Sequence, residues 1–183
     1  IEKFVPASGA ASRMFKNMFA FTNSGRTAPE TDFEKQYFDN INHFAFYPAL
    51  NKACDKIYKA TIPQLIQDGK YVEIAKTMLE SNGLNYGFLP KALLQFHRAA
   101  GGGVHTSLEE HLEEGAQYAT NGKREVNIHF TVSPEHRMEF DKVLKAKLPA
   151  MEMVWGVKYN VTMSEQKQAT DTIAVNLDNT PYR

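Results

Sequence analysis

The sequence predicts an α/β fold, in which a mostly parallel sheet carries a helical insertion after its first strand. An apolar stretch at residues 2–7 leads directly into a loop of small residues. Residues 29–82 then place their apolar side chains at helical spacing. In the second half of the chain, stretches that alternate like strands follow stretches that repeat like helices. Because strands that alternate with helices build parallel sheets, we expect one α/β domain over residues 1–183, with a helical insertion at residues 17–88.

The first half is predicted to contain one strand and several helices. Residues 2–7 form the short buried strand, and Ser12 is expected to begin the helix that follows the loop. Further along, Thr31 and Glu34 have the spacing of a capping box, which marks the start of a helix. Two prolines then divide the helical region into shorter helices, and Gly83 ends the last of them.

The second half is predicted to alternate strands with two helices. Thr106 and Glu109 form a second capping box, and Ser133 stands in the position of an N-cap directly before a proline. Between them, apolar and polar side chains alternate strictly, which is typical of a half-buried strand. The strands expected in this half are residues 92–96, 126–132, 157–163 and 173–177.

Composition and charge exclude several classes of protein. The 183 residues are 43% hydrophobic and 23% charged, as in an ordinary globular protein. Lys and Arg number 21 and Asp and Glu number 21, so no net charge favours nucleic acid or an anionic membrane as a partner. Cys54 is the single cysteine, which excludes an internal disulfide, and no apolar run is long enough to span a bilayer. We therefore expect a cytoplasmic protein. Because the chain begins at Ile1 rather than Met, we also expect it to be part of a longer one.

The loop from Ala7 to Arg13 is the strongest candidate for a binding site. Its small residues let the backbone approach another group closely, and Arg13 offers a planar fork that can hold two phosphate oxygens. A loop between a strand and a helix also presents backbone N–H groups to an anion. The loop matches neither GxxxxGK(S/T) nor GxGxxG, which disfavours P-loop kinases and dinucleotide-binding folds. A strand-to-helix turn with a solvated Arg13 is the other interpretation of these residues.

The loop resembles the signature loop of sugar nucleotidyltransferases, Gly-x-Gly-Thr-Arg-Leu/Met. Gly9 takes the place of its first glycine, Ser12 of its threonine and Arg13 of its arginine. Pro90 and Lys91 are similar to the Pro-Lys motif of the same family. The similarity covers about half of the chain and is greatest with an uncharacterised bacterial branch of the nucleotide-diphospho-sugar transferase superfamily. In the same order as in the family, it continues through residues 106–115, 128–135 and 166–172.

The resemblance implies a Rossmann-like sheet of the nucleotide-diphospho-sugar transferase type, in a domain that continues beyond Arg183. It also implies an enzyme that joins a nucleoside triphosphate to a sugar 1-phosphate and releases pyrophosphate. Arg13 would hold the leaving pyrophosphate and Lys91 the phosphate at the reacting centre. Mg²⁺ is the implied cofactor, with Asp171 and Asp178 as weak candidates for its ligands. The residues implied to bind the nucleotide are Ala7, Ser8, Gly9, Ala10, Ser12, Gln166, Thr170 and Thr172.

Two departures from the family pattern leave other functions open. Ala11 stands where the family has its second glycine, and residues 17–88 separate Arg13 from Lys91 where the family's motifs follow closely. These departures favour an alternative, a non-catalytic module that binds a nucleotide or a nucleotide sugar. A third hypothesis is an interaction domain whose helical insertion docks a partner. For the enzyme, the strand order predicts that Arg13, Lys91 and Gln166 line one cleft with the loop as its floor.

The other chemistry-bearing residues favour no second site. The six histidines are scattered without metal-ligand spacing, so a zinc site is not predicted. His129 lies on the polar side of its strand. It is interpreted as a surface residue, or as a residue that contacts the residues of a site without touching the ligand. The sequence has no GxSxG motif for a nucleophilic serine. The acidic run from Glu109 to Glu114 is typical of a solvated helix face.

Overall fold

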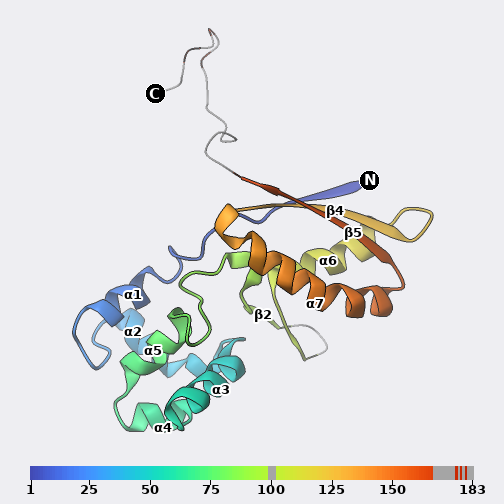
Figure 1. Cartoon of the computed structure of the whole chain (residues 1–183). Helices are drawn as coiled ribbons and strands as arrows, with labels where there is room; N and C mark the ends of the chain where they lie inside the picture. The colour runs from blue at the N-terminus through green and yellow to red at the C-terminus, as the bar shows by residue number, and fades with distance from the viewer. Residues whose placement is uncertain (99–101, 167–175, 177, 179, 181–183) are drawn as a thin grey trace. The chain divides into compact units, whose positions relative to one another are not determined.

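The computed structural model describes residues 1–98, 102–166, 176, 178 and 180. The chain divides into two compact units, one made of residues 1–8 and 114–183 and the other of residues 9–113. The first unit holds a parallel sheet with helices, and the second is mainly helical (Figure 1). The predicted α/β class is therefore confirmed. The predicted insertion at residues 17–88 lies within the second unit, and folding of residues 1–183 as one domain stays a prediction.

The sheet of the first unit is parallel throughout its three strands. Its strands are β1 (Glu2–Pro6), β4 (Glu125–Val132) and β5 (Lys158–Glu165), in the order β1-β4-β5. Val5 pairs with Phe130, which pairs with Met163 on the other side. The predictions of strands at residues 2–7, 126–132 and 157–163 are confirmed, but β1 buries only Val5, so the predicted burial of that strand is wrong. The strand predicted at residues 173–177 lies outside the described residues except for Asn176.

Strict alternation along β4 determines which face of the sheet is buried. Val126, Ile128, Phe130 and Val132 are completely buried, whereas the residues between them are partly exposed. Helix α7 (Arg137–Trp155) and the end of α6 (Ser107–Tyr118) lie on the same side of the sheet (Figure 1). Burial of four large apolar side chains contributes roughly 1.5–3 kcal/mol each to the hydrophobic free energy. The helices thus cover one face, and the first unit has its core between them and the sheet.

Helix α6 approaches the sheet closely at Gly115. A Cβ atom built there would lie 2.9 Å from Ile128 Cδ1 and 2.9 Å from Val126 Cγ1. We expect Gly115→Ala to overpack this contact and to lower the free energy of unfolding by up to about 2 kcal/mol, because the better helix propensity of alanine offsets about 1 kcal/mol of an overpacking cost of about 1–3 kcal/mol. Urea denaturation of the two proteins measures the difference. Gly122→Ala is the control, because a Cβ there meets no heavy atom within 4 Å, and an equal loss in both variants would contradict the prediction.

Within its described residues, the second unit contains five complete α-helices around an aromatic core, and residues 107–113 of α6 also belong to it. Phe21, Leu50, Ile74 and Met78 are completely buried in one cluster with further aromatic rings. A two-stranded antiparallel ladder of β2 (His97–Arg98) and β3 (Val104–His105) belongs to the same unit. The helices are α1 (Lys16–Asn23), α2 (Asp32–Asp39), α3 (Tyr47–Tyr58), α4 (Ile62–Gln67) and α5 (Tyr71–Leu79).

Both predicted capping boxes are confirmed. The Glu34 amide donates to Thr31 Oγ1 at 3.3 Å, and the Thr31 amide donates to Glu34 Oε2 at 3.1 Å. Before α6, the Thr106 amide donates to Glu109 Oε2 at 2.9 Å, and the Glu109 amide donates to Thr106 Oγ1 at 3.2 Å. Glu109 is buried, so the prediction that the acidic residues from Glu109 to Glu114 form a solvated helix face is wrong at this residue.

Three predictions of local structure are wrong. The last helix before Pro90, α5, ends at Leu79 rather than at Gly83. Residues 12–15 form a turn in which the Met14 and Phe15 amides donate to the Ala11 carbonyl, so α1 begins at Lys16 rather than at Ser12. Residues 92–96 do not form a strand, because Lys91–Leu93 is a 3₁₀ helix after Pro90. In that helix the Leu93 amide donates to the Pro90 carbonyl at 3.0 Å, so the backbone bonds locally instead of pairing in a sheet.

A buried ion pair joins the start of α2 to the turn before it. Arg26 Nη1 and Nη2 donate to the Glu34 carboxylate at 2.8 and 2.7 Å. The side chain of Glu34 is 4% exposed and that of Arg26 is 27% exposed. The hydrogen bonds from Arg26, joined by those from the Glu30 and Thr31 amides, lower the pKa of Glu34 to about 2 although burial opposes this. The sequence analysis identified Glu34 as a capping residue only.

No helix within the described part of the chain is both long and apolar enough to cross a membrane.

Candidate functional site

The small-residue loop leaves the sheet at the carboxyl end of β1. The Ala7 amide donates to the Thr131 carbonyl at 2.8 Å, which extends the pairing of β1 with β4 by one residue. Ligands of open α/β sheets bind beyond this edge, because loops there are free to carry functional groups. The division between the two units falls between Ser8 and Gly9, so Ala7 and Ser8 belong to the first unit and residues 9–13 to the second.

In the first unit, Ser8 is held by residues that follow the two neighbouring strands. Its hydroxyl donates to Gln166 Oε1 at 2.5 Å, and its carbonyl accepts from the Ser133 hydroxyl at 3.1 Å. The Gln166 amide in turn donates to the Val132 carbonyl at 2.8 Å. The predicted neighbours Ser8 and Gln166 therefore meet directly. Ser133 precedes the 3₁₀ helix η3 (Pro134–His136), but its side chain makes no cap hydrogen bond and binds the loop instead.

A hollow of about 380 Å³ opens at the carboxyl ends of the three strands. Its polar wall combines the Thr131 and Ser164 hydroxyls, the Glu165 carboxylate and the Gln166 amide, and rings of β1 form the rest. Arg137 Nη1 lies 3.6 Å from Glu165 Oε1. Hydroxyls and an amide at a strand end provide donors and acceptors for a polar ligand.

In the second unit, the Pro-Lys motif contacts the loop through its backbone. The Lys91 amide donates to the Gly9 carbonyl at 3.0 Å, and Ala10 forms an isolated antiparallel bridge with Pro90. The long helical region between the two motifs therefore does not keep them apart. Lys91 is exposed, and its side chain makes no hydrogen bond or ion pair with another described residue.

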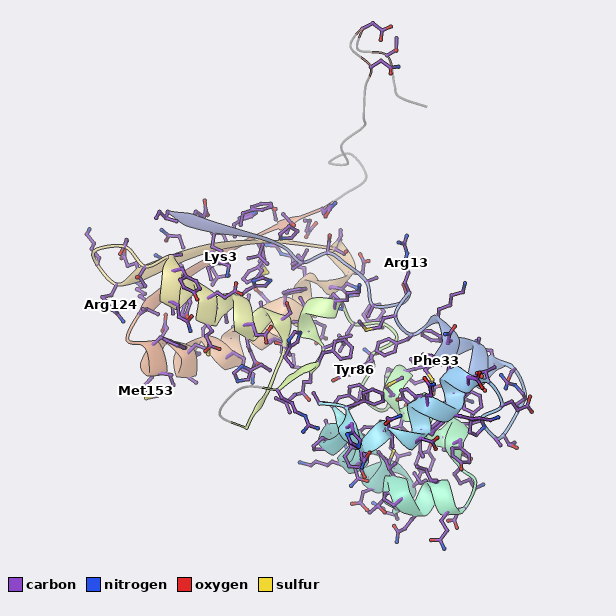
Figure 2. All side chains as sticks on the ribbon, turned by 180° about the vertical axis from the view of Figure 1, so that it is seen from behind. Lys3, Arg13, Phe33, Tyr86, Arg124 and Met153 are labelled. Carbon is purple, nitrogen blue, oxygen red and sulfur yellow. The ribbon has the colours of Figure 1, made fainter. Side chains whose placement is uncertain are left out.

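Arg13 lies in the turn that precedes α1. Its side chain is exposed and projects from its own segment, without an ion pair to any residue that the structure describes (Figure 2). Ser12 is exposed beside it, whereas Ala11 is 1% exposed and packs in the aromatic core of the second unit. The methyl group of Ala11 is thus part of the core of the second unit.

Gly9 has open space around its α-carbon. A Cβ atom built there would meet no heavy atom within 4 Å, and Gly9 is not one of the described glycines with positive φ. Neither backbone strain nor packing against the described residues requires glycine at this position. The backbone at Gly9 is therefore open to close approach by another group.

The remaining predicted site residues are Thr170, Asp171, Thr172 and Asp178. Thr170, Asp171 and Thr172 lie outside the described residues. Asp178 accepts hydrogen bonds from the Thr180 hydroxyl at 2.6 Å and the Thr180 amide at 3.1 Å, and the pKa of its carboxyl is lowered by these bonds. No group of three or more His, Cys, Asp or Glu residues in the described ranges could hold a metal ion. The predicted cleft that combines residues of both units stays a prediction.

His129 makes more contacts with its neighbours than the sequence indicated. Its Nδ1 lies 2.7 Å from Thr162 Oγ1, and its Nε2 lies 2.8 Å from Ser164 Oγ. Its ring stacks on Phe4, with centroids 5.5 Å apart and planes 12° apart. The alternating polar residues of two predicted strands were the signal for this contact. What was missing was the parallel register that places Thr162 opposite His129.

Comparisons with known proteins identify the family of the chain. No curated protein and no solved structure matches it. A family model described as "Domain of unknown function (DUF4301)" matches residues 1–183, which is the whole of the sequence. The chain therefore belongs to the DUF4301 family.

Proposed function

We propose that this protein is a nucleotidyltransferase-like enzyme that forms a nucleotide sugar from a nucleoside triphosphate and a sugar 1-phosphate. In this proposal its parallel sheet is Rossmann-like, of the nucleotide-diphospho-sugar transferase type. A single observation carries the proposal: the Lys91 amide donates to the Gly9 carbonyl. This contact supports the proposal because the resemblance requires the Pro-Lys motif beside the small-residue loop, although residues 17–88 separate the two in the sequence.

The proposed reaction needs positioned charges rather than a protein nucleophile. An oxygen of the sugar phosphate attacks the α-phosphorus of the triphosphate, the bond from that phosphorus to the bridging oxygen breaks, and pyrophosphate leaves with the electron pair. Arg13 holds the leaving pyrophosphate with its planar fork, and Lys91 neutralises the reacting phosphate as a point charge. Ser8, Gln166 and the other loop residues stay proposed contacts of the nucleotide. Mg²⁺ stays the proposed cofactor, which would neutralise phosphate charge, and no step here depends on it.

The second candidate function is a module that binds a nucleotide or a nucleotide sugar without turnover. The buried Ala11 favours it, because a methyl group replaces the glycine at which the family's backbone approaches the nucleotide. Isothermal titration calorimetry with the four nucleoside triphosphates and Mg²⁺ tests both candidates. A coupled assay of pyrophosphate release with a panel of sugar 1-phosphates separates them. Binding without release supports the module, and absence of binding refutes both.

Arg13 supplies a specific test of the enzyme proposal. Loss of a charge-assisted phosphate contact costs about 1.5–3 kcal/mol, so Arg13→Ala is expected to weaken triphosphate binding by roughly 10- to 150-fold. Arg13→Lys should not restore it, because a single ammonium cannot hold two oxygens in a fork. Calorimetry gives the affinities. Lys52→Ala removes another exposed charge of the second unit and is the control. Full affinity in Arg13→Ala, or recovery in Arg13→Lys, would contradict the assigned role.

A further inference from the structure

The face of the sheet opposite the helices carries a regular patch of polar and aromatic side chains. In the parallel register, Glu2 pairs with Asn127 and Asn127 with Asn160, and two residues further along Phe4 pairs with His129 and His129 with Thr162. Register partners in a parallel sheet point to the same face. All six side chains are exposed or partly exposed. We call them the sheet patch: Glu2, Phe4, Asn127, His129, Asn160 and Thr162.

The chemistry of the sheet patch indicates a polar occupant. Parallel sheets usually have both faces covered, and strands buried on both faces are almost continuously apolar. In β4 the strict alternation gives the helix-covered face its apolar residues and leaves amide, imidazole and hydroxyl groups on the other. A packed helix or second sheet would need apolar side chains here. This face is therefore suited to water or to a ligand that is recognised through hydrogen bonds.

One exposed ring distinguishes the patch from an ordinary solvated face. Phe4 is 61% exposed in the middle of polar neighbours. It is held in place because its ring stacks on His129, whose two nitrogens are both hydrogen-bonded to hydroxyls of β5. An aromatic ring that is fixed in this way loses little conformational entropy when a ligand packs on it. The stack is thus a preorganised apolar platform in a polar setting.

A hollow of about 290 Å³ lies next to this platform. It is lined by the Glu2 carboxylate, the Asn127 and Asn160 amides and the Thr162 hydroxyl, together with Ile1. Asn160 Nδ2 donates to Asn127 Oδ1 at 3.0 Å, which fixes the orientation of both amides. This hydrogen bond leaves the amide nitrogen of Asn127 available as a donor to a ligand and the amide oxygen of Asn160 available as an acceptor. The hollow therefore offers both kinds of hydrogen-bonding group, and the exposed ring of Phe4 lies in the next row of the same face.

We propose that the sheet patch is a binding surface for a neutral saccharide. A pyranose has one face of C–H groups, which packs on an aromatic ring, and a rim of hydroxyls that both donate and accept hydrogen bonds. In this arrangement the C–H face lies on Phe4 and the hydroxyls bond to the amides and the carboxylate of the hollow. Phe4 also lines the hollow at the carboxyl ends of the strands, but the other five residues do not, and none of the six belongs to the small-residue loop. The saccharide proposal therefore needs none of the residues proposed to bind the nucleotide.

The charge of the patch argues against a phosphate-bearing ligand such as a single-stranded nucleic acid. Glu2 contributes a negative charge, and none of the six residues is Lys or Arg. Lys158 of β5 is basic and lies on the same face, but it stands opposite the acidic Glu125 of β4 in the strand register. Binding of a nucleic-acid backbone depends on cations that neutralise its phosphates. An uncharged polyol needs none, which is why the observations favour a saccharide.

Nuclear magnetic resonance titration of the whole chain tests the proposal. The probes are glucose, N-acetylglucosamine, maltose and cellobiose, with a single-stranded oligonucleotide as a further arm. We expect at least one saccharide to shift the ring signals of His129 and the side-chain amide signals of Asn127 and Asn160, with a Kd on the order of 1 mM. Phe4→Ala should weaken this binding by about tenfold or more, whereas Phe4→Tyr should retain it.

Controls separate binding at the patch from other effects. Tyr118→Ala removes a ring that is 79% exposed on α6 and should leave saccharide binding unchanged. Asn160→Ala should weaken binding while the thermal midpoint stays near that of the parent, because its side chain is exposed. Absence of shifts at the patch up to about 50 mM of every saccharide, equal binding by Phe4→Ala, or binding of the oligonucleotide alone would each overturn the proposal. The affinity of the parent protein for nucleoside triphosphates, measured separately by calorimetry, distinguishes a failure of saccharide binding from a failure of the proposed function.

Discussion

The Gly9→Val variant is expected to fold normally and to lose nucleotide binding by about a hundredfold or more. The fold tolerates the change because a Cβ at Gly9 meets no heavy atom within 4 Å and its φ is not positive. The ligand does not tolerate it if phosphate oxygens approach the backbone there, since a branched side chain would occupy their space. Calorimetry with nucleoside triphosphates gives the affinity, and circular dichroism with a thermal melt reports the fold.

Gly122→Val is the matched control for this experiment. Gly122 also has no heavy atom within 4 Å of a Cβ, also lacks a positive φ, and precedes the amino end of β4 rather than following the carboxyl end of β1. We expect its nucleotide affinity to equal that of the parent protein. A folded Gly9→Val protein with unchanged nucleotide affinity would contradict close approach of a phosphate to this loop. The proposed function would then lose the residue on which nucleotide binding mainly depends.

The sheet could be predicted because its strands carry their own pattern. In β4 the alternation of Val126 to Val132 determines both the strand and its buried face, and no distant contact is needed to recognise it. The capping boxes at Thr31 and Thr106 are equally local, since each joins residues three apart. Local patterns of this kind were sufficient for the α/β class.

Other features depend on contacts that no local pattern contains. Residues 92–96 are apolar enough for a strand, but Pro90 starts a 3₁₀ helix and Leu94 is buried in the core of the second unit. Ser133 has the sequence of an N-cap, yet its hydroxyl donates to the Ser8 carbonyl at the end of the neighbouring strand. In both cases tertiary packing overrides a local preference, which the sequence alone does not reveal.

The candidate site could be predicted only in part, because some of its contacts join residues that are far apart in the sequence. Ser8 and Gln166 were expected together because both follow the carboxyl ends of parallel strands, and they share a hydrogen bond. The approach of Lys91 to Gly9 was an expectation from resemblance alone, because residues 17–88 have no counterpart in the family pattern. The platform of Phe4 on His129 was not foreseen, since it needs the exact pairing of β1 with β4.

The ion pair of Glu34 with Arg26 is expected to make the stability of the protein depend on pH in the acidic range. The pKa of Glu34 is about 2 in the folded protein, below its ordinary value of 4.5. A carboxyl whose pKa is lowered by folding stabilises the native state above its unfolded pKa, and this contribution is lost as the pH falls toward the folded pKa. The stabilisation by Glu34 should therefore be complete at neutral pH and decline between pH 4.5 and about 2.

Glu34→Gln removes the charge but keeps the shape of the side chain, so it isolates this contribution. Breaking a buried ion pair costs about 3–5 kcal/mol, and the partial exposure of Arg26 places the expected loss near 3 kcal/mol at neutral pH. Urea denaturation at several pH values measures the difference between the two proteins, which should shrink as the pH falls below 4.5. Glu73→Gln is the control, because Lys70 Nζ lies 3.7 Å from Glu73 and is 56% exposed, and such pairs contribute less than about 1 kcal/mol. A loss in Glu34→Gln that equals the control, or that stays constant down to pH 2, would contradict a charge interaction and leave only the capping box at this helix start.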